Sequence, residues 1–224
     1  VNDLDEPTSL LIRDSVIEQV QDNQVITLKG GASLDIQRSV LRDFNPTAFQ
    51  GFGNIAIRAE AASTIGLQDV VFDEGGVVML AGNPAEMSLG AMVDAQNVTI
   101  SDFNSGFYLY GGSGLSLTDV QINSPVDAAI SLEDGTMTLD RVLVESATLS
   151  QNGILSVRSD TTVSDVLVRG GVLGFSVDGG TATGARLALI DSAGTGLDLS
   201  GADTVVTFED VEVKGSKFFG VYNK

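Results

Sequence analysis

Six side chains between residues 108 and 222 have the chemistry of a sugar-binding surface. They comprise all three tyrosines of the chain, two acids and one arginine: Tyr108, Tyr110, Glu133, Arg158, Asp178 and Tyr222. Aromatic rings stack on the apolar faces of sugars, and guanidinium or carboxylate groups hold polar substituents through paired hydrogen bonds. These residue types therefore predict a carbohydrate-binding groove, provided that the fold brings them to one face.

Short strands that open with glycine are expected to position these side chains. They read GFYLY (106–110), GILSV (153–157), GFSV (174–177) and GLDL (196–199). Alternate residues of a strand point the same way, so two outward columns are expected. The first contains Tyr108, Ser131, Ser156, Ser176, Asp198 and Tyr222, and the second contains Tyr110, Glu133, Arg158, Asp178 and Ser200, extended by Arg58 and Lys29. The structural alternative is that tyrosine is a favoured strand residue that tolerates partial exposure.

A second pattern indicates that the strands belong to a repeat. The stretches SLTDVQI (116–122), TLDRVLV (138–144), TVSDVLV (162–168) and TFEDVEV (207–213) share one frame. The residue after the charged position recurs every 21 to 31 residues, and the nine anchors are Ser15, Ser39, Val70, Val98, Val120, Val142, Val166, Leu187 and Val211. Apolar residues five and three before most anchors, and two after them, indicate two short strands joined at a bend. Gly184 interrupts this frame.

Each unit contains three short strands and three corners, and it is too small to bury its own apolar face. Stacked copies can bury that face, with every strand paired in parallel to its copies above and below. Nine rungs at a spacing of about 4.8 Å would form a rod roughly 40 Å long. The sequence therefore predicts a single all-β solenoid domain over residues 1–224. Because the chain begins with Val, we expect it to be a segment or a processed form of a longer protein.

Over roughly residues 10 to 224, these units resemble the coils of parallel β-helix proteins with the pectate-lyase-like fold. The resemblance implies an all-β, right-handed parallel β-helix of about nine three-strand coils. It implies no single activity, because lyases, hydrolases, epimerases, phage tailspikes and non-catalytic surface proteins share this coil. Lyases of this type use an arginine or lysine base beside calcium that clustered acids hold. A polysaccharide lyase or epimerase that uses Glu133, Arg158 and Asp178 on an acidic glycan is therefore an alternative.

The residue before each anchor changes charge along the chain. In order, these residues are Asp14, Arg38, Asp69, Asn97, Asp119, Arg141, Asp165, Arg186 and Asp210. Equivalent residues of neighbouring coils lie about one strand spacing apart, so each arginine is expected beside two carboxylates. We interpret this column as an exposed charge ladder at a corner, whose main effects are on register and solubility. A row of catalytic carboxylates is the functional alternative, which the arginines would neutralise.

Composition excludes several classes of function. A net charge of −18, from 30 acids and 12 bases, argues against nucleic acid and anionic membrane surfaces. The chain has no histidine and no cysteine, which removes Ser-His-Asp triads, histidine acid–base catalysis and the usual zinc sites. No apolar run is long enough to span a membrane. We expect no cofactor, with calcium as the open alternative.

Two of the longer units carry insertions. Residues 42–54 contain Phe44, Phe49 and Phe52, and residues 81–92 contain two of the four methionines. Insertions in solenoids form loops, and loops on a rigid scaffold often carry specificity. We favour the other role for the phenylalanine-rich loop, which is to cover one corner of the core.

The prediction is a non-catalytic β-helix module of an exported bacterial protein, secreted or on the cell surface. Its expected partner is a polysaccharide or another surface macromolecule. The alternatives are the lyase or epimerase described above and a structural spacer rod that only sets distance. Solenoid ends expose strand edges that can pair, so end-to-end self-association or contact with neighbouring domains of a longer chain is also expected.

Overall fold

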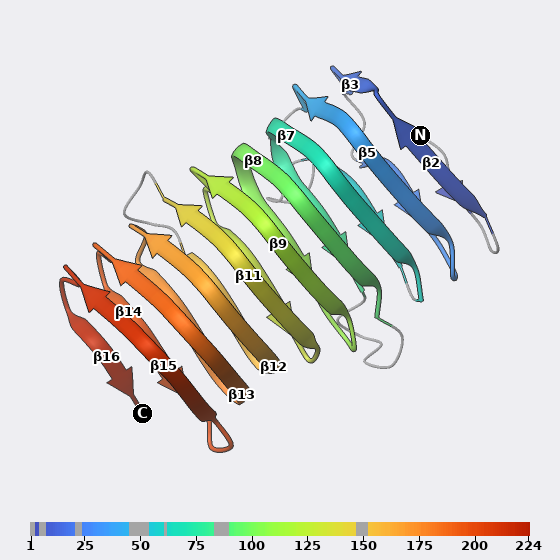
Figure 1. The fold of residues 1–224 in the computed structure, drawn as a ribbon. Helices are drawn as coiled ribbons and strands as arrows, with labels where there is room; N and C mark the ends of the chain where they lie inside the picture. Colours follow the sequence, from blue (N-terminus) through green and yellow to red (C-terminus); the bar gives the residue numbers. More distant parts are fainter. Residues whose placement is uncertain are drawn as a thin grey trace.

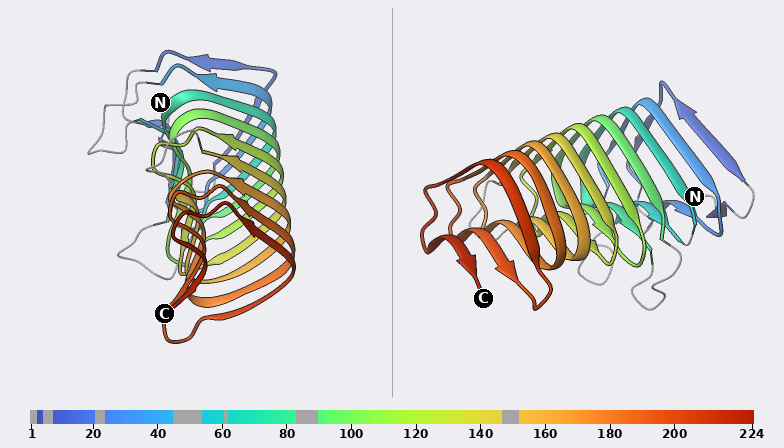
Figure 2. Two further views of the ribbon diagram at one scale, coloured as in Figure 1. Left: turned by 90° about the vertical axis from the view of Figure 1, so that its left-hand side faces the viewer. Right: turned by 60° about the horizontal axis from the view of Figure 1, so that its bottom comes forward.

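The computed structural model describes residues 3–4, 8–20, 24–44, 54–60, 62–82, 90–146 and 152–224. Within these ranges every regular element is a β-strand, and the strands stack in parallel as a β-solenoid of about eight turns. The coils follow one another in chain order along one axis (Figure 1), and further views show the strands of neighbouring coils side by side (Figure 2). The predicted parallel β-helix is confirmed.

Each coil contains one short strand and one long, bent strand. The short strands are β1 (Asp3–Leu4), β4 (Gln24–Leu28), β6 (Ile55–Ala59), β10 (Ala128–Glu133), β14 (Thr195–Ser200) and β16 (Phe219–Asn223). The long strands are β2 (Ser9–Arg13) with β3 (Val16–Glu18), β5 (Ser33–Arg42), β9 (Gly114–Asn123), β11 (Thr136–Glu145) and β15 (Val205–Lys214). In four elements both kinds run together: β7 (Thr64–Ala81), β8 (Met92–Leu109), β12 (Asn152–Arg169) and β13 (Leu173–Ile190).

The pairing register confirms the repeat derived from the sequence. Ser39 pairs with Val70, and the chain of partners then runs through Val98, Val120, Val142, Val166, Leu187 and Val211. Val40 donates its N–H to the carbonyl of Ser15, which places the first anchor beside Ser39. All nine anchors therefore occupy one column. Nine successive rungs are separated by eight steps, which agrees with a solenoid of about eight turns.

Inward-facing apolar side chains fill the interior of every coil. Val, Leu and Ile dominate most coils, and an aromatic cluster lies in the N-terminal half. The rings of Phe44 and Phe72 both meet Phe103 edge to face, with centroids 6.4 and 6.2 Å away. Phe44 is buried at the end of the long strand, as expected for a residue that covers the core. Phe49 and Phe52 lie outside the described residues.

Left-handed backbone conformations mark three corners of the solenoid. All nine residues of the charge ladder have φ between 47 and 56°, which shows that the bend predicted before each anchor lies at the ladder residue itself. A second corner follows the long strand, at Gln19, Asp43, Glu74, Asp102, Ser124, Gly170, Asp191 and Gly215. A third follows the short strand, at Ala62, Gly82, Gly111, Asp134, Arg158, Gly179 and Gly201. Gly, Asn and Asp adopt this conformation most readily, which explains why aspartate recurs.

Candidate functional site

Two of the three tyrosines form a pair at the end of β8. Tyr108 and Tyr110 are both partly buried, and their ring centroids are 5.2 Å apart with planes tilted by 54°. Burial raises the pKa of Tyr110 above its usual range, and a hydrogen bond with Tyr108 and the nearby charge of Glu133 act in the same direction. The Tyr110 hydroxyl therefore keeps its proton and offers a neutral hydrogen-bonding group beside two aromatic faces.

The first outward column differs from the prediction at one rung. The partners of Tyr108 run through Ser131, Leu155, Ser176 and Asp198 to Tyr222, whereas Ser156 is fully buried. In β12 the polarity of two neighbours is inverted, because the outward residue is Leu155 and the inward residue is the serine. The Ser156 hydroxyl lies 2.8 Å from that of Thr161, which satisfies it inside the core.

The same shift removes Arg158 from the second column. Val157, not Arg158, pairs with Glu133 and with Asp178. Arg158 stands one residue later, at the third corner, where its φ is 46°. Of the two residues predicted to extend this column toward the N-terminus, Arg58 belongs instead to the column of Tyr108. Lys29 stays in the second column, because Leu28, which precedes it, shares a column with Leu109, which precedes Tyr110.

Arg158 is fully engaged by two carboxylates of the preceding coil. Its Nε and Nη2 donate to the two oxygens of Asp134 at 2.9 and 2.8 Å, and Nη2 also contacts Glu133. These hydrogen bonds raise the pKa of Arg158 further and lower the pKa of Asp134. An arginine that acts as a general base must lose a proton, so this environment opposes the role that the lyase alternative gives to Arg158.

The remaining predicted residues are spread along the solenoid. Asp178 is exposed and lines a hollow of about 440 Å³ together with Arg158 and a run of glycines. Tyr222 lies in the column of Tyr108 but five rungs away, about 24 Å at the strand spacing, and its ring contacts Phe219 with centroids 5.0 Å apart. The structure therefore brings together Tyr108, Tyr110, Glu133 and Arg158 near one corner, and leaves Tyr222 as a separate aromatic site.

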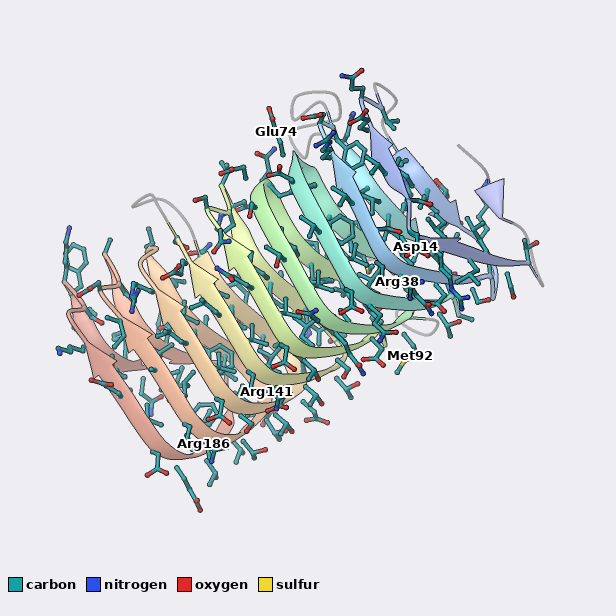
Figure 3. All side chains as sticks on the ribbon, turned by 45° about the horizontal axis from the view of Figure 1, so that its top comes forward. Asp14, Arg38, Glu74, Met92, Arg141 and Arg186 are labelled. Atoms are coloured by element: carbon teal, nitrogen blue, oxygen red, sulfur yellow. The ribbon has the colours of Figure 1, made fainter. Side chains whose placement is uncertain are left out.

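The charge ladder is confirmed as a column, but its arginines do not bridge two neighbours. Arg38, Arg141 and Arg186 each donate from Nε and Nη2 to both oxygens of the aspartate one coil earlier, at 2.5 to 2.9 Å. Asn97 donates to Asp69 of the preceding coil at 2.6 Å. Four pairs thus replace the continuous ladder, and the labelled members follow one line along the rod (Figure 3).

These pairs explain why arginine occupies left-handed positions. Aspartate and asparagine tolerate that backbone, whereas the long side chain of arginine gains nothing locally from it. A bidentate charge-assisted contact to the neighbouring coil offsets the strain. The same contacts lower the pKa values of Asp14, Asp119 and Asp165 through hydrogen bonds from their arginines.

A groove that the sequence reasoning missed lies on the first half of the long strands. Its volume is about 670 Å³, and it extends from β2 across β5 and β7 to β8 and the start of β9. Asp35, Gly66 and Asp94 stand in successive rungs of one outward column. Met92 borders the groove on the outside of the coils (Figure 3). The only sequence signal was a glycine inside a strand, which marks close approach of another group to the backbone.

Within the described part of the chain, no three acids come close enough together to hold a metal ion. The same residues include no helix of the length and apolarity that crossing a bilayer requires. Met87 of the second insertion lies outside the described residues.

Comparisons of this chain with protein-family models, with curated proteins and with solved structures found no match. The parallel β-solenoid is thus established by its own register, and the pectate-lyase-like subtype stays a prediction.

Proposed function

We propose that this protein is a non-catalytic carbohydrate-binding rod whose binding face includes Tyr108 and Tyr110. The single observation that carries the proposal is the tyrosine pair, which presents two aromatic rings and a protonated hydroxyl beside Glu133. Aromatic rings with a polar edge suit the alternating apolar and hydroxyl surfaces of a sugar ring. The rigid stack of coils holds both rings in place before any ligand arrives, which reduces the entropy lost on binding.

The proposed setting is the surface of a bacterial cell or the secreted fraction. A chain without cysteine, with a net charge of −18, suits a soluble exported module, and the solenoid gives it an extended surface. The partner is a polysaccharide, or a glycan carried by another surface macromolecule. The pectate-lyase-like subtype of the coil belongs to the same proposal.

A glycan-array screen of the intact chain, run with calcium and with chelator, tests this proposal. Binding should fall at least about tenfold in Tyr110→Ala, because the stacking face and a hydrogen-bonding hydroxyl are lost together. Tyr222→Ala is the matched control, since it removes a tyrosine in the column of Tyr108, five rungs away from the pair, and binding should persist. Equal binding by both variants and the unchanged protein, or no glycan bound under either condition, would contradict the proposal and favour a spacer rod.

A further inference from the structure

The groove over Gly66 (the groove lined by Leu11, Asp35, Gly66, Met92 and Asp94) lies on a different strand column from the tyrosines. Its volume of about 670 Å³ is in the range of small-molecule sites, roughly 300–1,000 Å³. Leu11 at one end and Met92 at the other are 50% and 56% exposed. Three rung steps separate the column positions of Leu11 and Asp94, about 14 Å, which is longer than one sugar ring.

The backbone does not require a glycine at position 66. Its φ is not in the left-handed region, and an added Cβ would meet only the Asp35 carboxylate, with Oδ1 at 3.4 Å, which is ordinary van der Waals contact. A glycine inside a strand weakens the strand, so another reason must account for it. The missing side chain leaves the strand surface at Gly66 covered only by the Asp35 carboxylate, so a ligand beside Asp35 and Asp94 can reach the strand there.

The groove is acidic and contains no basic side chain among the residues that line it. Asp35 Oδ2 accepts a hydrogen bond from the neutral amide of Gln37 at 2.8 Å. The other lining side chains are hydroxyls or apolar groups, including those of Ser33 and Thr64. Gln37 in turn accepts a hydrogen bond from Arg13 at 2.9 Å, so this arginine reaches Gln37 and not the carboxylate. Six other arginines pair directly with an acid of a neighbouring coil. Asp35 and Asp94 are not among the acids paired in this way, so within the described residues the groove keeps two carboxylates without a direct arginine contact.

We propose that the groove over Gly66 binds an amino-sugar oligomer, with an ammonium group held between Asp35 and Asp94. Carboxylates form their strongest hydrogen bonds with cationic donors, and they also accept from sugar hydroxyls. The apolar carbons of the rings lie toward Leu11 and Met92. An anionic glycan would meet two carboxylates and the net charge of the chain, so charge complementarity selects a cationic ligand. This site stands independently of the tyrosine face.

Isothermal titration calorimetry with the intact chain tests the inference, using a glucosamine oligomer and its fully N-acetylated counterpart as probes. N-acetylation removes the positive charge and keeps the ring, so it isolates the ammonium group. We expect the glucosamine oligomer to bind at least about tenfold more tightly than the N-acetylated one, with an affinity that falls as salt is added. Equal affinities, or no heat with either probe, would overturn the inference.

Three variants locate the site on the molecule. Asp35→Asn and Asp94→Asn keep the shape and remove one charge each, and each should weaken glucosamine binding about tenfold. Gly66→Val fills the gap with a residue that strands favour and should abolish binding. Thr138→Val is the matched control, because it changes the same outward column two rungs beyond Asp94, outside the groove. Unchanged binding by Gly66→Val would overturn the inference.

The tyrosine face and this groove can fail separately. Tyr110→Ala should leave glucosamine binding unchanged, and Gly66→Val should leave the glycan-array result of the tyrosine face unchanged. Loss of glucosamine binding in Tyr110→Ala would assign that ligand to the tyrosine face and overturn the assignment to the groove.

Discussion

Solvent-facing aspartates occur in two settings in this molecule. At the ladder corner, Asp119 is left-handed and accepts two hydrogen bonds from Arg141 of the next coil. In the groove over Gly66, Asp35 has only a neutral amide partner and shares the cavity with Asp94. At these two places, the corner carboxylate is neutralised by an arginine of the next coil, whereas the groove carboxylate has a neutral partner. The comparison teaches that an aspartate of this chain can either fix a corner or leave negative charge in a groove.

The largest expected effect is a difference in the free energy of unfolding between valine variants at Gly184 and at Gly66, two glycines that each precede a ladder corner. Gly184 has φ +150°, and an added Cβ would lie 1.9 Å from the carbonyl oxygen of Val163, whereas Gly66 has room for one. Gly184→Val should lower the free energy of unfolding by roughly 2–4 kcal/mol, through strain and overpacking. Gly66→Val should leave it unchanged or raise it by up to about 1 kcal/mol. Chemical denaturation of both variants measures this.

A similar loss in both glycine variants would mean that Gly66 is structural. The contrast between the corner and the groove would then lose its functional meaning, because the gap beside Asp35 would follow from packing alone.

A smaller effect is expected from reversing one charge of the ladder. Arg141→Asp places an acid between Asp119 and Asp165 and removes the contact that offsets the left-handed backbone. The melting temperature should fall by a few degrees. The double variant Asp119→Arg with Arg141→Asp restores an opposite-charge pair in reversed order and should recover most of the loss in thermal unfolding. A double variant as unstable as the single one would show that pairing is not what the corner needs.

The smallest effect is a pH dependence of stability that arises at the ladder. Arg141 lowers the pKa of Asp119 from its ordinary value of 3.8, chiefly through its hydrogen bonds. Because the pKa is lower in the folded state than in the unfolded state, the stabilisation is complete above 3.8 and is lost as the pH falls through the folded value. The gap in melting temperature between the unchanged protein and Arg141→Gln should therefore be constant above about pH 5 and close in acid.

The corresponding control is Asp35→Asn, which removes a groove carboxylate that has no arginine partner. Measured at each pH beside Arg141→Gln, it separates the general effect of removing one surface charge from the effect of the ladder contact. A gap for Arg141→Gln that persists at low pH would show that the arginine acts through packing and not through its charge.

The fold could be predicted from the sequence because every coil of a solenoid repeats the same short pattern of apolar and charged residues. Nine anchors were derived from a spacing of apolar residues around a charged position, and the register places all nine in one column. The recurring aspartates were interpreted as charges alone. Their backbone conformation gives a local reason for the choice of aspartate, because each lies at a corner where φ is positive.

The candidate sites were harder to predict, because they depend on which residues share a column. Leu155 faces outward and Ser156 inward, which inverts the usual polarity of the strand. A prediction that takes every second polar residue as outward therefore places Arg158 in the second outward column, which it does not occupy. The groove requires Asp35, Gly66 and Asp94 to be aligned across coils of unequal length. Spacings of 31 and 28 residues conceal that alignment until the insertions are placed.

The direction of the ladder contacts has a consequence for how such a rod can evolve. Each contact joins a coil to the one before it, so the ladder sorts the coils into couples that begin with an aspartate: Asp14 with Arg38, Asp69 with Asn97, Asp119 with Arg141, and Asp165 with Arg186. Duplication of a single coil would place two identical ladder residues side by side, whereas duplication or loss of one whole couple would keep the contacts of the others intact. Length changes in steps of one couple are therefore the ones that this corner tolerates at least cost.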